Sequence, residues 1–390
     1  MMAIKIAQYT LTTALGAGKA AHINPLTAGI SALTPIKIGA DAKSFAGRVE
    51  GLDVVTIPTH LHHYDCRNNR LAYSALVQDN FLQSVINMRD QLGSARGGIF
   101  VGTSTSGILS TEQAYRQSEN FQRLPSWYHY PFTQNPSSLA NFVAALTGIS
   151  GPAYTVSTAC SSSAKVFASA LRALNAGVID YALVGGVDSL CDTTLQGFNS
   201  LQLVDSQRCK PFDRNRSGIN LGEAGGFALL VRGAASGDLT VLGVGESSDA
   251  YHMSSPHPEG VGAYVAMQQA LASAGINCAD INYINLHGTA TPANDLAEGK
   301  AVTRLFATTP LCSSTKGFTG HTLGAAGIVE INLCLLAIEY QKAWGNTQLA
   351  DYDAATGLKP LLNTQNSPIN LALSNSFGFG GSNCSVVVGQ

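Results

Sequence analysis

The chain has 390 residues, of which 12% are charged and 45% are hydrophobic, and its formal net charge is −2. An ordinary globular chain has about 25% charged residues, so much of this surface is either uncharged or covered. The composition excludes a disordered chain, and the charge excludes a strongly basic nucleic-acid binder. At about 150 residues per domain, the length predicts two to three domains or one large one.

The cysteines and the apolar segments indicate where the protein works. Eight cysteines are scattered without a C-x-x-C pair, so we expect neither a structural zinc site nor another metal site. A long chain without clustered cysteines is typical of a reducing compartment, and we expect a cytoplasmic protein. No apolar run reaches the roughly 18 residues of a membrane span. Gln8 and several threonines interrupt the first apolar stretch, and no signal peptide is expected.

Short apolar runs bounded by Gly, Asn or Ser are predicted to be buried strands, because they are short, β-branched and flanked by glycine. Apolar residues at helical spacing predict helices over Ser161–Gly177 and Gly324–Tyr340. Strands that alternate with helices predict an α/β fold built in layers. In chain order the predicted strands are Gly98–Gly102, Ala153–Ser157, Tyr181–Gly186, Phe227–Val231, Ile281–Leu286, Ile369–Ser374 and Ser385–Gly389.

The two halves of the chain are loosely alike. In each half, a turn of small residues that carries a reactive side chain opens a long helix. Cys160 does this in the first half and the Lys316–Gly327 stretch in the second. We interpret this likeness as a hint of duplication. Small residues at Gly233–Gly237 mark a boundary, which divides the chain into residues 1–233 and 234–390.

The segment Tyr154-Thr-Val-Ser-Thr-Ala-Cys160-Ser-Ser-Ser-Ala-Lys predicts a nucleophile. A strand ends there, the chain turns through small residues, and a helix begins with Cys160 at its mouth. Such a turn exposes a side chain as a nucleophile elbow does. The helix N-terminus favours negative charge, so we expect it to lower the pKa of the thiol. Taken alone, a cysteine is more often an inert core residue.

Two histidines strengthen the prediction of a catalytic site. One lies in Asn285-Leu-His287-Gly-Thr289-Ala-Thr291-Pro, just past a predicted strand, and the other in Lys316-Gly-Phe-Thr-Gly-His321-Thr-Leu-Gly-Ala-Ala-Gly, before a helix. Open α/β sheets bind ligands at the carboxyl ends of their strands, so we expect both histidines near Cys160. Ser376-Phe-Gly-Phe379-Gly-Gly-Ser fits either a close approach to a ligand or a tight connection between strands.

These segments together resemble the elongating β-ketoacyl-acyl carrier protein synthases, the decarboxylating Cys-His-His condensing enzymes of fatty-acid and polyketide synthesis. Thr158-Ala-Cys160-Ser-Ser, the two histidine segments and Asn375-Ser-Phe-Gly-Phe-Gly-Gly-Ser-Asn carry the resemblance, which runs from about Cys66 to the C-terminus. It implies a thiolase fold, a duplicated five-layer α-β-α-β-α sandwich that is normally dimeric. The implied reaction is a decarboxylative Claisen condensation of malonyl-acyl carrier protein with an acyl chain held on Cys160.

The resemblance also assigns roles to individual residues. Cys160 matches the nucleophile, while His287 and His321 match the pair that polarises the malonyl thioester carbonyl. One hydrogen-bond donor aimed at the developing enolate is typically worth about 3–4 kcal/mol. Lys316 and Glu330 match an ion pair that would orient His321. The remaining assignments are an oxyanion hole from the backbone N–H groups of Cys160 and Phe379, phosphopantetheine contacts from Thr289 and Thr291, and an acyl pocket lined by Ile219 and Phe379.

Some features depart from the family pattern. Ile219 stands where elongating synthases of fatty-acid synthesis often carry an aromatic gate, and the chain before about Gly51 matches the family poorly. Both features put an ordinary fatty-acid role in question and leave a specialised polyene or other polyketide pathway open. His60-Leu-His-His63 and Cys66 could suggest metal ligands, but alternating side chains favour a surface or interface stretch. Gly222-Glu-Ala-Gly-Gly226 lacks the Lys-Ser/Thr of a phosphate loop.

The resemblance implies an acyl carrier protein as partner and no cofactor beyond its phosphopantetheine. Arg67, Arg70, Arg208 and Lys210 are predicted to form a basic patch for this acidic partner. We expect no nucleic-acid or membrane partner. A homodimer and a heterodimer with a related subunit that lacks the nucleophile both remain open. The residues also bear on three alternatives. Cys160 argues against a non-catalytic chain-length factor, and His321 argues against a CoA-dependent thiolase. A non-catalytic scaffold would not need the Cys/His/His set.

Overall fold

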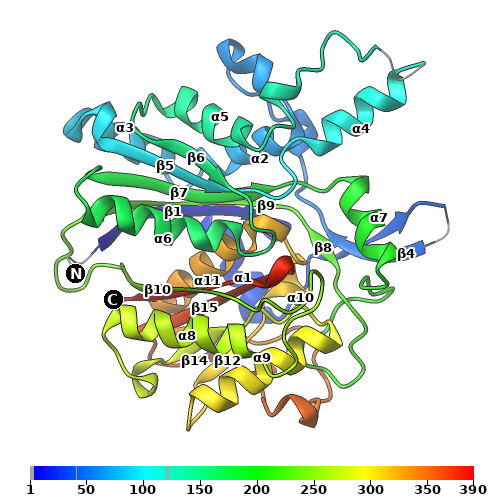
Figure 1. Cartoon of the computed structure of the whole chain (residues 1–390), viewed down its shortest axis with the longest axis vertical. Coiled ribbons are helices and arrows are strands. Elements are labelled where there is room, and N and C mark those ends of the chain that lie inside the picture. The colour runs from blue at the N-terminus through cyan, green and yellow to red at the C-terminus, as the bar shows by residue number, and fades with distance from the viewer. Residues whose placement is uncertain (1–3, 41, 120–122) are drawn as a thin grey trace.

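The computed structural model describes residues 4–40, 42–119 and 123–390. One long sheet crosses the molecule in the order β12-β11-β15-β16-β10-β1-β9-β7-β5-β6 (Figure 1). In chain order these strands are β1 (Ile4–Thr13), β5 (Gly97–Gly102), β6 (Ala153–Val156), β7 (Tyr181–Asp188), β9 (Ala224–Arg232), β10 (Thr240–Ser248), β11 (Tyr283–Asn285), β12 (Leu311–Ser313), β15 (Leu371–Gly378) and β16 (Ser382–Gly389). All seven predicted strands are present, several of them longer than predicted.

The sheet is made of two five-stranded parts that repeat one topology. In the first part, β6, β5 and β7 are parallel neighbours, and β9 and β1 follow in antiparallel pairing. In the second part, β12, β11 and β15 are parallel, and β16 and β10 follow in the same way. Among the described residues, strand pairing joins the two parts where Ile4 and Lys5 of β1 face Val241 and Thr240 of β10. The predicted boundary at 233/234 lies in the β9–β10 connection, and its status as a division into two domains stays a prediction.

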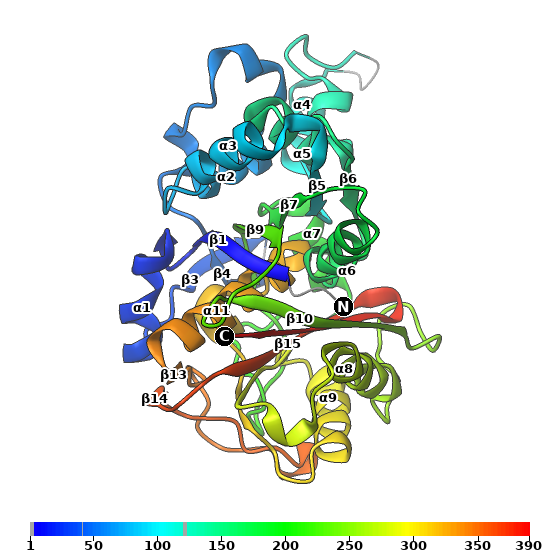
Figure 2. The same cartoon turned by 90° about the vertical axis from the view of Figure 1, so that its left-hand side faces the viewer.

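Helices cover both parts of the sheet and fill the space between them. Viewed from the side, α2, α3 and α5 lie outside the first part, α6 and α11 lie between the two parts, and α8 and α9 lie outside the second (Figure 2). This arrangement is the five-layer sandwich of the thiolase fold, as predicted. The helices are α2 (Arg67–Leu76), α3 (Phe81–Leu92), α5 (Ser137–Thr147), α6 (Ser162–Asn175), α8 (Val261–Ala274), α9 (Pro292–Leu305) and α11 (Ala326–Tyr340).

Smaller elements lie around these layers. A three-stranded sheet combines β3 (Thr34–Ile38), β4 (Ala42–Gly47) and β8 (Leu221–Gly222), and β13 (Lys342–Ala343) pairs with β14 (Gln365–Asn366). β2 (Gly16–Ala17) pairs with the end of β1. The remaining α-helices are α1 (Lys19–Ala28), α4 (Ile108–Gln117), α7 (Asp192–Ser200) and α10 (Lys316–Thr319).

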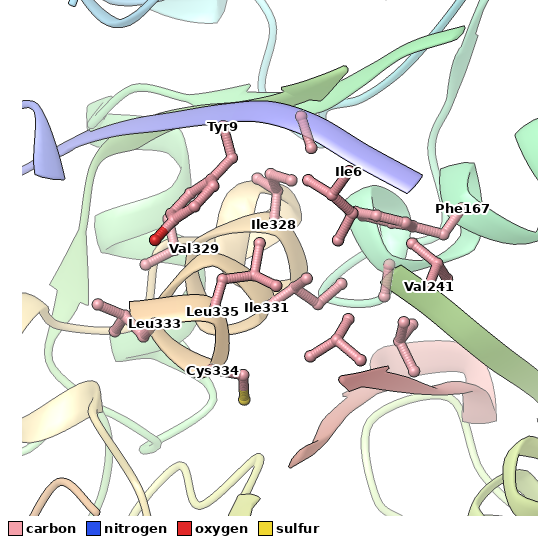
Figure 3. Close-up of a cluster of buried hydrophobic side chains, with 14 of the residues drawn as sticks. Ile6, Tyr9, Phe167, Val241, Ile328, Val329, Ile331, Leu333, Cys334 and Leu335 are labelled. Carbon is pink, nitrogen blue, oxygen red and sulfur yellow. The ribbon is translucent and has the colours of Figure 1, made fainter. Parts of the chain in front are cut away.

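Helix α11 is the centre of the hydrophobic core. Ile328, Ile331 and Leu335 face Ile6 of β1 and Val241 of β10 (Figure 3). A helix that is apolar on every side is stable in water only when it is buried on every side, and α11 meets that condition. The stretch 323–340, which includes α11, is apolar and long enough to cross a membrane, contrary to the sequence-based expectation, but 89% of it is buried inside the protein. Its apolarity is explained by its place between the two parts of the sheet.

Two stretches near the N-terminus differ from what the sequence suggested. Residues 4–13, whose sequence matches the family poorly, form β1, a central strand paired with β9 along most of its length. The stretch containing His60, His62 and His63 is a short 3-10 helix, η2 (Thr59–Tyr64), so its side chains do not alternate, although it lies at the surface as predicted. All three histidines are exposed, while neighbouring Cys66 is buried.

Candidate active site

Cys160 lies on a tight turn between β6 and α6, at the boundary between the two halves of the molecule. Ala159 adopts a left-handed conformation with φ of 51°, which turns the chain sharply before the cysteine. Two hydrogen bonds hold the turn, from Thr158 N to Ser162 Oγ at 2.9 Å and from Ser162 Oγ to Ala159 O at 2.6 Å. The small residues around Cys160 are therefore needed for this turn, as the sequence suggested.

The predicted low pKa of this thiol is wrong. Cys160 is only 5% exposed, and burial raises the pKa of its thiol to about 12. The Lys316 ammonium and the backbone N–H of Phe379, which points at the sulfur, lower the pKa but do not offset burial. Low solvation penalises the thiolate more strongly than these partners stabilise it. The resting nucleophile is therefore a thiol.

Both histidines reach the sulfur from the second half of the chain. His321 Nε2 lies 3.0 Å from Cys160 Sγ, and the ring centroids of His287 and His321 are 5.4 Å apart. One ligating atom from each of the three side chains lies within 4.8 Å of the other two; within the described ranges, this trio is also the group positioned to hold a metal ion. The structure thus brings together the cysteine and the two histidines that the sequence selected.

The hydrogen bonds of the two imidazoles determine which ring nitrogen carries the proton. Leu323 N–H donates to His321 Nδ1 at 3.3 Å, and Lys316 Nζ donates to His287 Nδ1 at 3.4 Å. A neutral imidazole that accepts at Nδ1 carries its proton on Nε2. Burial and the nearby Lys316 charge hold the pKa of both histidines well below its ordinary value, so both rings are neutral near pH 7. Each ring therefore has an Nε2–H group available as a donor.

The predicted partner of Lys316 is correct, but the histidine that it orients is not. Lys316 Nζ forms an ion pair with Glu330 and donates to the backbone O of His287 at 2.6 Å. Both charged side chains are almost fully buried. The bond to His287 Nδ1 completes this contact, so Lys316 orients His287 rather than His321. Although Lys316 is close to His321 in sequence, its side chain extends to the end of β11.

Two buried residues that the sequence analysis missed hold His287 in place. The carboxylate of Glu298, on α9, accepts the backbone N–H groups of His287 and Gly288, both at 2.8 Å. Asn375 Nδ2, from β15, donates to the same carboxylate at 3.1 Å. Burial raises the pKa of Glu298 to about 7 against the effect of these donors. The position of Glu298, eleven residues after His287 on the following helix, was the only sequence signal for this role.

The glycine-rich β15–β16 connection lies against the nucleophile. A Cβ at Gly378 would lie 2.9 Å from Thr158 O and 3.2 Å from Cys160 N, so only glycine allows this approach. The next residue, Phe379, directs its N–H toward the cysteine sulfur. The backbone N–H groups of Cys160 and Phe379 are thus neighbours, as an oxyanion hole requires.

A cavity of about 230 Å³ opens onto the three side chains. Thr289 and Thr291 line it, and their hydroxyls lie 2.9 Å apart. Ile219 forms part of the apolar wall and is 3% exposed. The predicted pantetheine and acyl-pocket residues therefore share one cavity with the nucleophile.

A second cavity of about 160 Å³ also borders Cys160 and Phe379, and Leu323 lines it. Phe198, on α7, lines both cavities and packs against Phe379 with ring centroids 5.5 Å apart. Both rings, like Cys160, therefore line the two cavities at once. The sequence analysis missed Phe198 because it lies on a helix with no motif.

Half of the predicted basic patch is already paired within the protein. Arg67 donates to Glu223, which is fully buried, and to Asp53. Arg70 pairs with Asp65 through two nitrogens, at 2.6 and 2.7 Å. These two arginines are structural, and the expectation that they offer free charge is wrong.

A five-layer sandwich with a cysteine and two neutral histidines around one cavity defines a Cys-His-His condensing enzyme. The family models described as the N-terminal and C-terminal domains of β-ketoacyl synthase match residues 71–235 and 239–349. The chain belongs to the β-ketoacyl synthase family, the condensing enzymes of fatty-acid and polyketide synthesis, and the predicted family is confirmed.

Known members of the family match three quarters or more of the chain. A 3-oxoacyl-acyl-carrier-protein synthase 2 of Rhizobium meliloti is 38% identical over 315 residues, which cover 75% of this chain and 73% of that protein. Nodulation protein E of a Rhizobium species is 32% identical over 380 residues, which cover 91% of each. Among solved structures, one chain of the complex of the Xenorhabdus doucetiae ketosynthase ApeO with its chain length factor ApeC is 37% identical with a TM-score of 0.91. That match covers 100% of this chain and 98% of the other.

Proposed function

We propose that this protein condenses an acyl chain held on Cys160 with malonyl-acyl carrier protein and releases CO₂. The observation that carries the proposal is the convergence of Cys160 Sγ and the two imidazole rings on one cavity, with atoms within 4.8 Å of one another. Relatives named as 3-oxoacyl-acyl-carrier-protein synthases support the substrate class.

The first half-reaction loads the acyl chain. The sulfur of Cys160 attacks the acyl thioester of a carrier protein, and the carbonyl oxygen becomes an oxyanion between the N–H groups of Cys160 and Phe379. The bond to the pantetheine sulfur then breaks, and that sulfur leaves with the proton that the thiol has lost. Because the thiol is protonated at rest, this proton must move before or during the attack. Thr289 and Thr291 lie where they can contact the pantetheine arm.

The second half-reaction makes the carbon–carbon bond. The malonyl carboxylate leaves as CO₂, and its electron pair forms an enolate whose oxygen accepts the Nε2–H groups of His287 and His321. The enolate carbon attacks the acyl thioester, the bond to Cys160 sulfur breaks, and the sulfur leaves as a thiolate. Neutral imidazoles suit this role, because they stabilise the enolate without protonating it outright. The product is a 3-oxoacyl chain two carbons longer.

The two half-reactions can be tested separately. Cys160→Ala should abolish acyl loading, measured as the mass of the acyl-enzyme, whereas His287→Ala and His321→Ala should still load but fail to decarboxylate malonyl-acyl carrier protein. Only the second half-reaction needs enolate stabilisation. Buried Cys191→Ala and exposed His62→Ala are matched controls, and both should keep both steps. Loading in the Cys160 variant, or normal decarboxylation in a histidine variant, would contradict the assignment.

We further propose that the working enzyme is a heterodimer with a related subunit that lacks the nucleophile, in a specialised polyene or polyketide pathway. The similarity to a chain of a complex between a ketosynthase and its chain length factor, at 37% identity over the whole chain, supports this proposal. Ile219 in place of an aromatic gate accords with it. The test is to express the chain alone and with a chain-length-factor subunit, then measure solution mass and product mass. A fully active homodimer that makes only saturated fatty acyl chains would overturn this second proposal and leave the first intact.

Carrier docking then depends on positive charges other than Arg67 and Arg70. Arg208 is exposed and stacks on Phe45 of β4 at 4.9 Å. Lys37 and Lys43 face each other across the β3–β4 hairpin beside it. In the described parts of the chain, no carboxylate forms an ion pair with these three side chains. We propose this group, with Lys210, as the steering surface for the acidic carrier. Its effect on binding should weaken with added salt.

A further inference from the structure

Asp188 is a fully buried carboxylate that neither half-reaction described above uses, although its charge adds to the rise in the pKa of the Cys160 thiol. It ends β7, beside the loop that follows β5. Its Oδ1 accepts the side-chain and backbone donors of that loop, Thr103 Oγ1 at 2.6 Å, Ser104 N at 2.9 Å, Thr105 N at 2.8 Å and Thr105 Oγ1 at 2.7 Å. A buried carboxylate with this many donors is ordinarily a fixed structural point.

One bond of Asp188 reaches into the other half of the molecule. Its Oδ2 accepts the backbone N–H of Gly324 at 2.5 Å and Ser104 Oγ at 2.6 Å. Gly324 directly follows Leu323, whose N–H donates to Nδ1 of His321. The Asp188 carboxylate of the first half therefore holds the Leu323–Gly324 turn of the second half in place, and this turn determines which ring nitrogen of His321 carries the proton.

The clamped turn is strained. Leu323 adopts φ of 54°, a left-handed conformation that a leucine holds only where its surroundings impose it. Packing at Gly324 is close as well, because a Cβ there would lie 2.7 Å from Asp188 Oδ2 and 2.8 Å from Ser104 N. If Asp188 no longer accepts the Gly324 N–H, the strained Leu323–Gly324 peptide can adopt a more favourable conformation. Nδ1 of His321 would then lose the Leu323 N–H that donates to it.

We propose that Asp188 is a positioning residue of the condensing reaction, which keeps Nδ1 of His321 unprotonated and its Nε2–H directed into the active-site cavity. It acts through the backbone of Leu323 and Gly324 and touches no substrate. This inference concerns the state of His321 and rests on the proposed function only for its effect on the rate.

The test is the tautomer of His321 in Asp188→Asn, read by ¹⁵N NMR of protein labelled at its histidines. Comparison with His321→Asn assigns the signals. Wild type should show an unprotonated Nδ1 and a protonated Nε2, whereas Asp188→Asn should show the other tautomer or exchange between the two. Malonyl decarboxylation should fall about tenfold or more, as for other residues that orient a reacting group through a hydrogen bond, and acyl loading should change less.

Matched variants separate this role from general stability. Asp213 is equally buried and its carboxylate accepts backbone N–H groups of Ala350 and Asp351, but none from the His321 turn. Asp213→Asn should leave the tautomer of His321 unchanged. If Asp188→Asn does not fold, Ser104→Ala should give a smaller shift toward the same mixed state, because it removes one donor to Asp188 Oδ2 and the weaker acceptor of the Gly324 N–H at 3.3 Å.

The outcomes distinguish the two proposals. A wild-type tautomer in Asp188→Asn or, if that variant does not fold, in Ser104→Ala overturns the positioning role. The same shift in both Asp variants overturns it too. If Asp188→Asn changes the tautomer of His321 but the wild-type enzyme does not decarboxylate malonyl-acyl carrier protein, Asp188 still controls that tautomer and the proposed function is refuted.

Discussion

The buried Lys316–Glu330 pair offers the sharpest test of how the site is supported. Both side chains are almost fully buried, with 2% and 3% of their surface exposed. Glu330→Leu would leave the Lys316 ammonium inside the protein with only the carbonyl of His287 and a long bond to its ring. Removing one member of a buried ion pair typically costs about 3–5 kcal/mol, and we expect that loss in the free energy of unfolding.

Removing both charges should cost much less. In Lys316→Met/Glu330→Leu no charge stays buried, and the main loss is the hydrogen bond to His287 O, about 1–2 kcal/mol. The double variant should therefore be more stable than Glu330→Leu alone. It should nevertheless lose about a hundredfold in malonyl decarboxylation, because His287 Nδ1 has lost its donor and the Nε2–H is no longer fixed.

The assay is guanidinium unfolding at one fixed protein concentration, combined with the two half-reaction measurements. The exposed pair Lys300–Glu259 is the control, and Glu259→Gln should change stability by no more than about 0.5 kcal/mol. If the double variant is as unstable as the single one, the buried charge is not what costs stability. If it decarboxylates at the wild-type rate, Lys316 does not orient His287.

Three further predictions follow from the same geometry. Product mass should show that Ile219→Phe shortens the longest product and that Phe198→Ala lengthens it by joining the cavities of about 230 and 160 Å³. Unchanged product masses in both variants would place the acyl chain elsewhere. Because burial raises the pKa of the Cys160 thiol to about 12, its thiolate fraction grows with pH, and alkylation by iodoacetamide should accelerate about tenfold per pH unit with no plateau below about pH 9. Arg67→Ala should lower the free energy of unfolding by about 3 kcal/mol, because it leaves Glu223 buried without its counter-ion. Arg208→Ala should instead weaken carrier binding at low salt with little change in stability. The reverse pattern would mean that Arg67 belongs to the docking surface.

The sequence by itself determined the reactive residues and the class of fold. Cys160, His287 and His321 each lie in a short segment whose glycines and small residues are local requirements of a turn, so the chemistry can be read without knowing what packs nearby. Seven strands and the helices α6 and α11 were predicted for the same reason, because periodicity and flanking glycines act over a few residues. β1 was missed since its residues resemble no motif, although its pairing with β9 makes it a central strand.

Only the tertiary structure decided how these segments support one another. Lys316 orients His287 rather than its neighbour His321, and Phe198 packs against Phe379 where both rings line the two cavities. Burial raised the pKa of the Cys160 thiol, and it removed Arg67 from the expected basic surface. Each of these outcomes depends on contacts between residues far apart in the chain and on the solvent that those contacts exclude. No local pattern contains that information, because desolvation and side-chain reach are set by the packing of the two halves against each other.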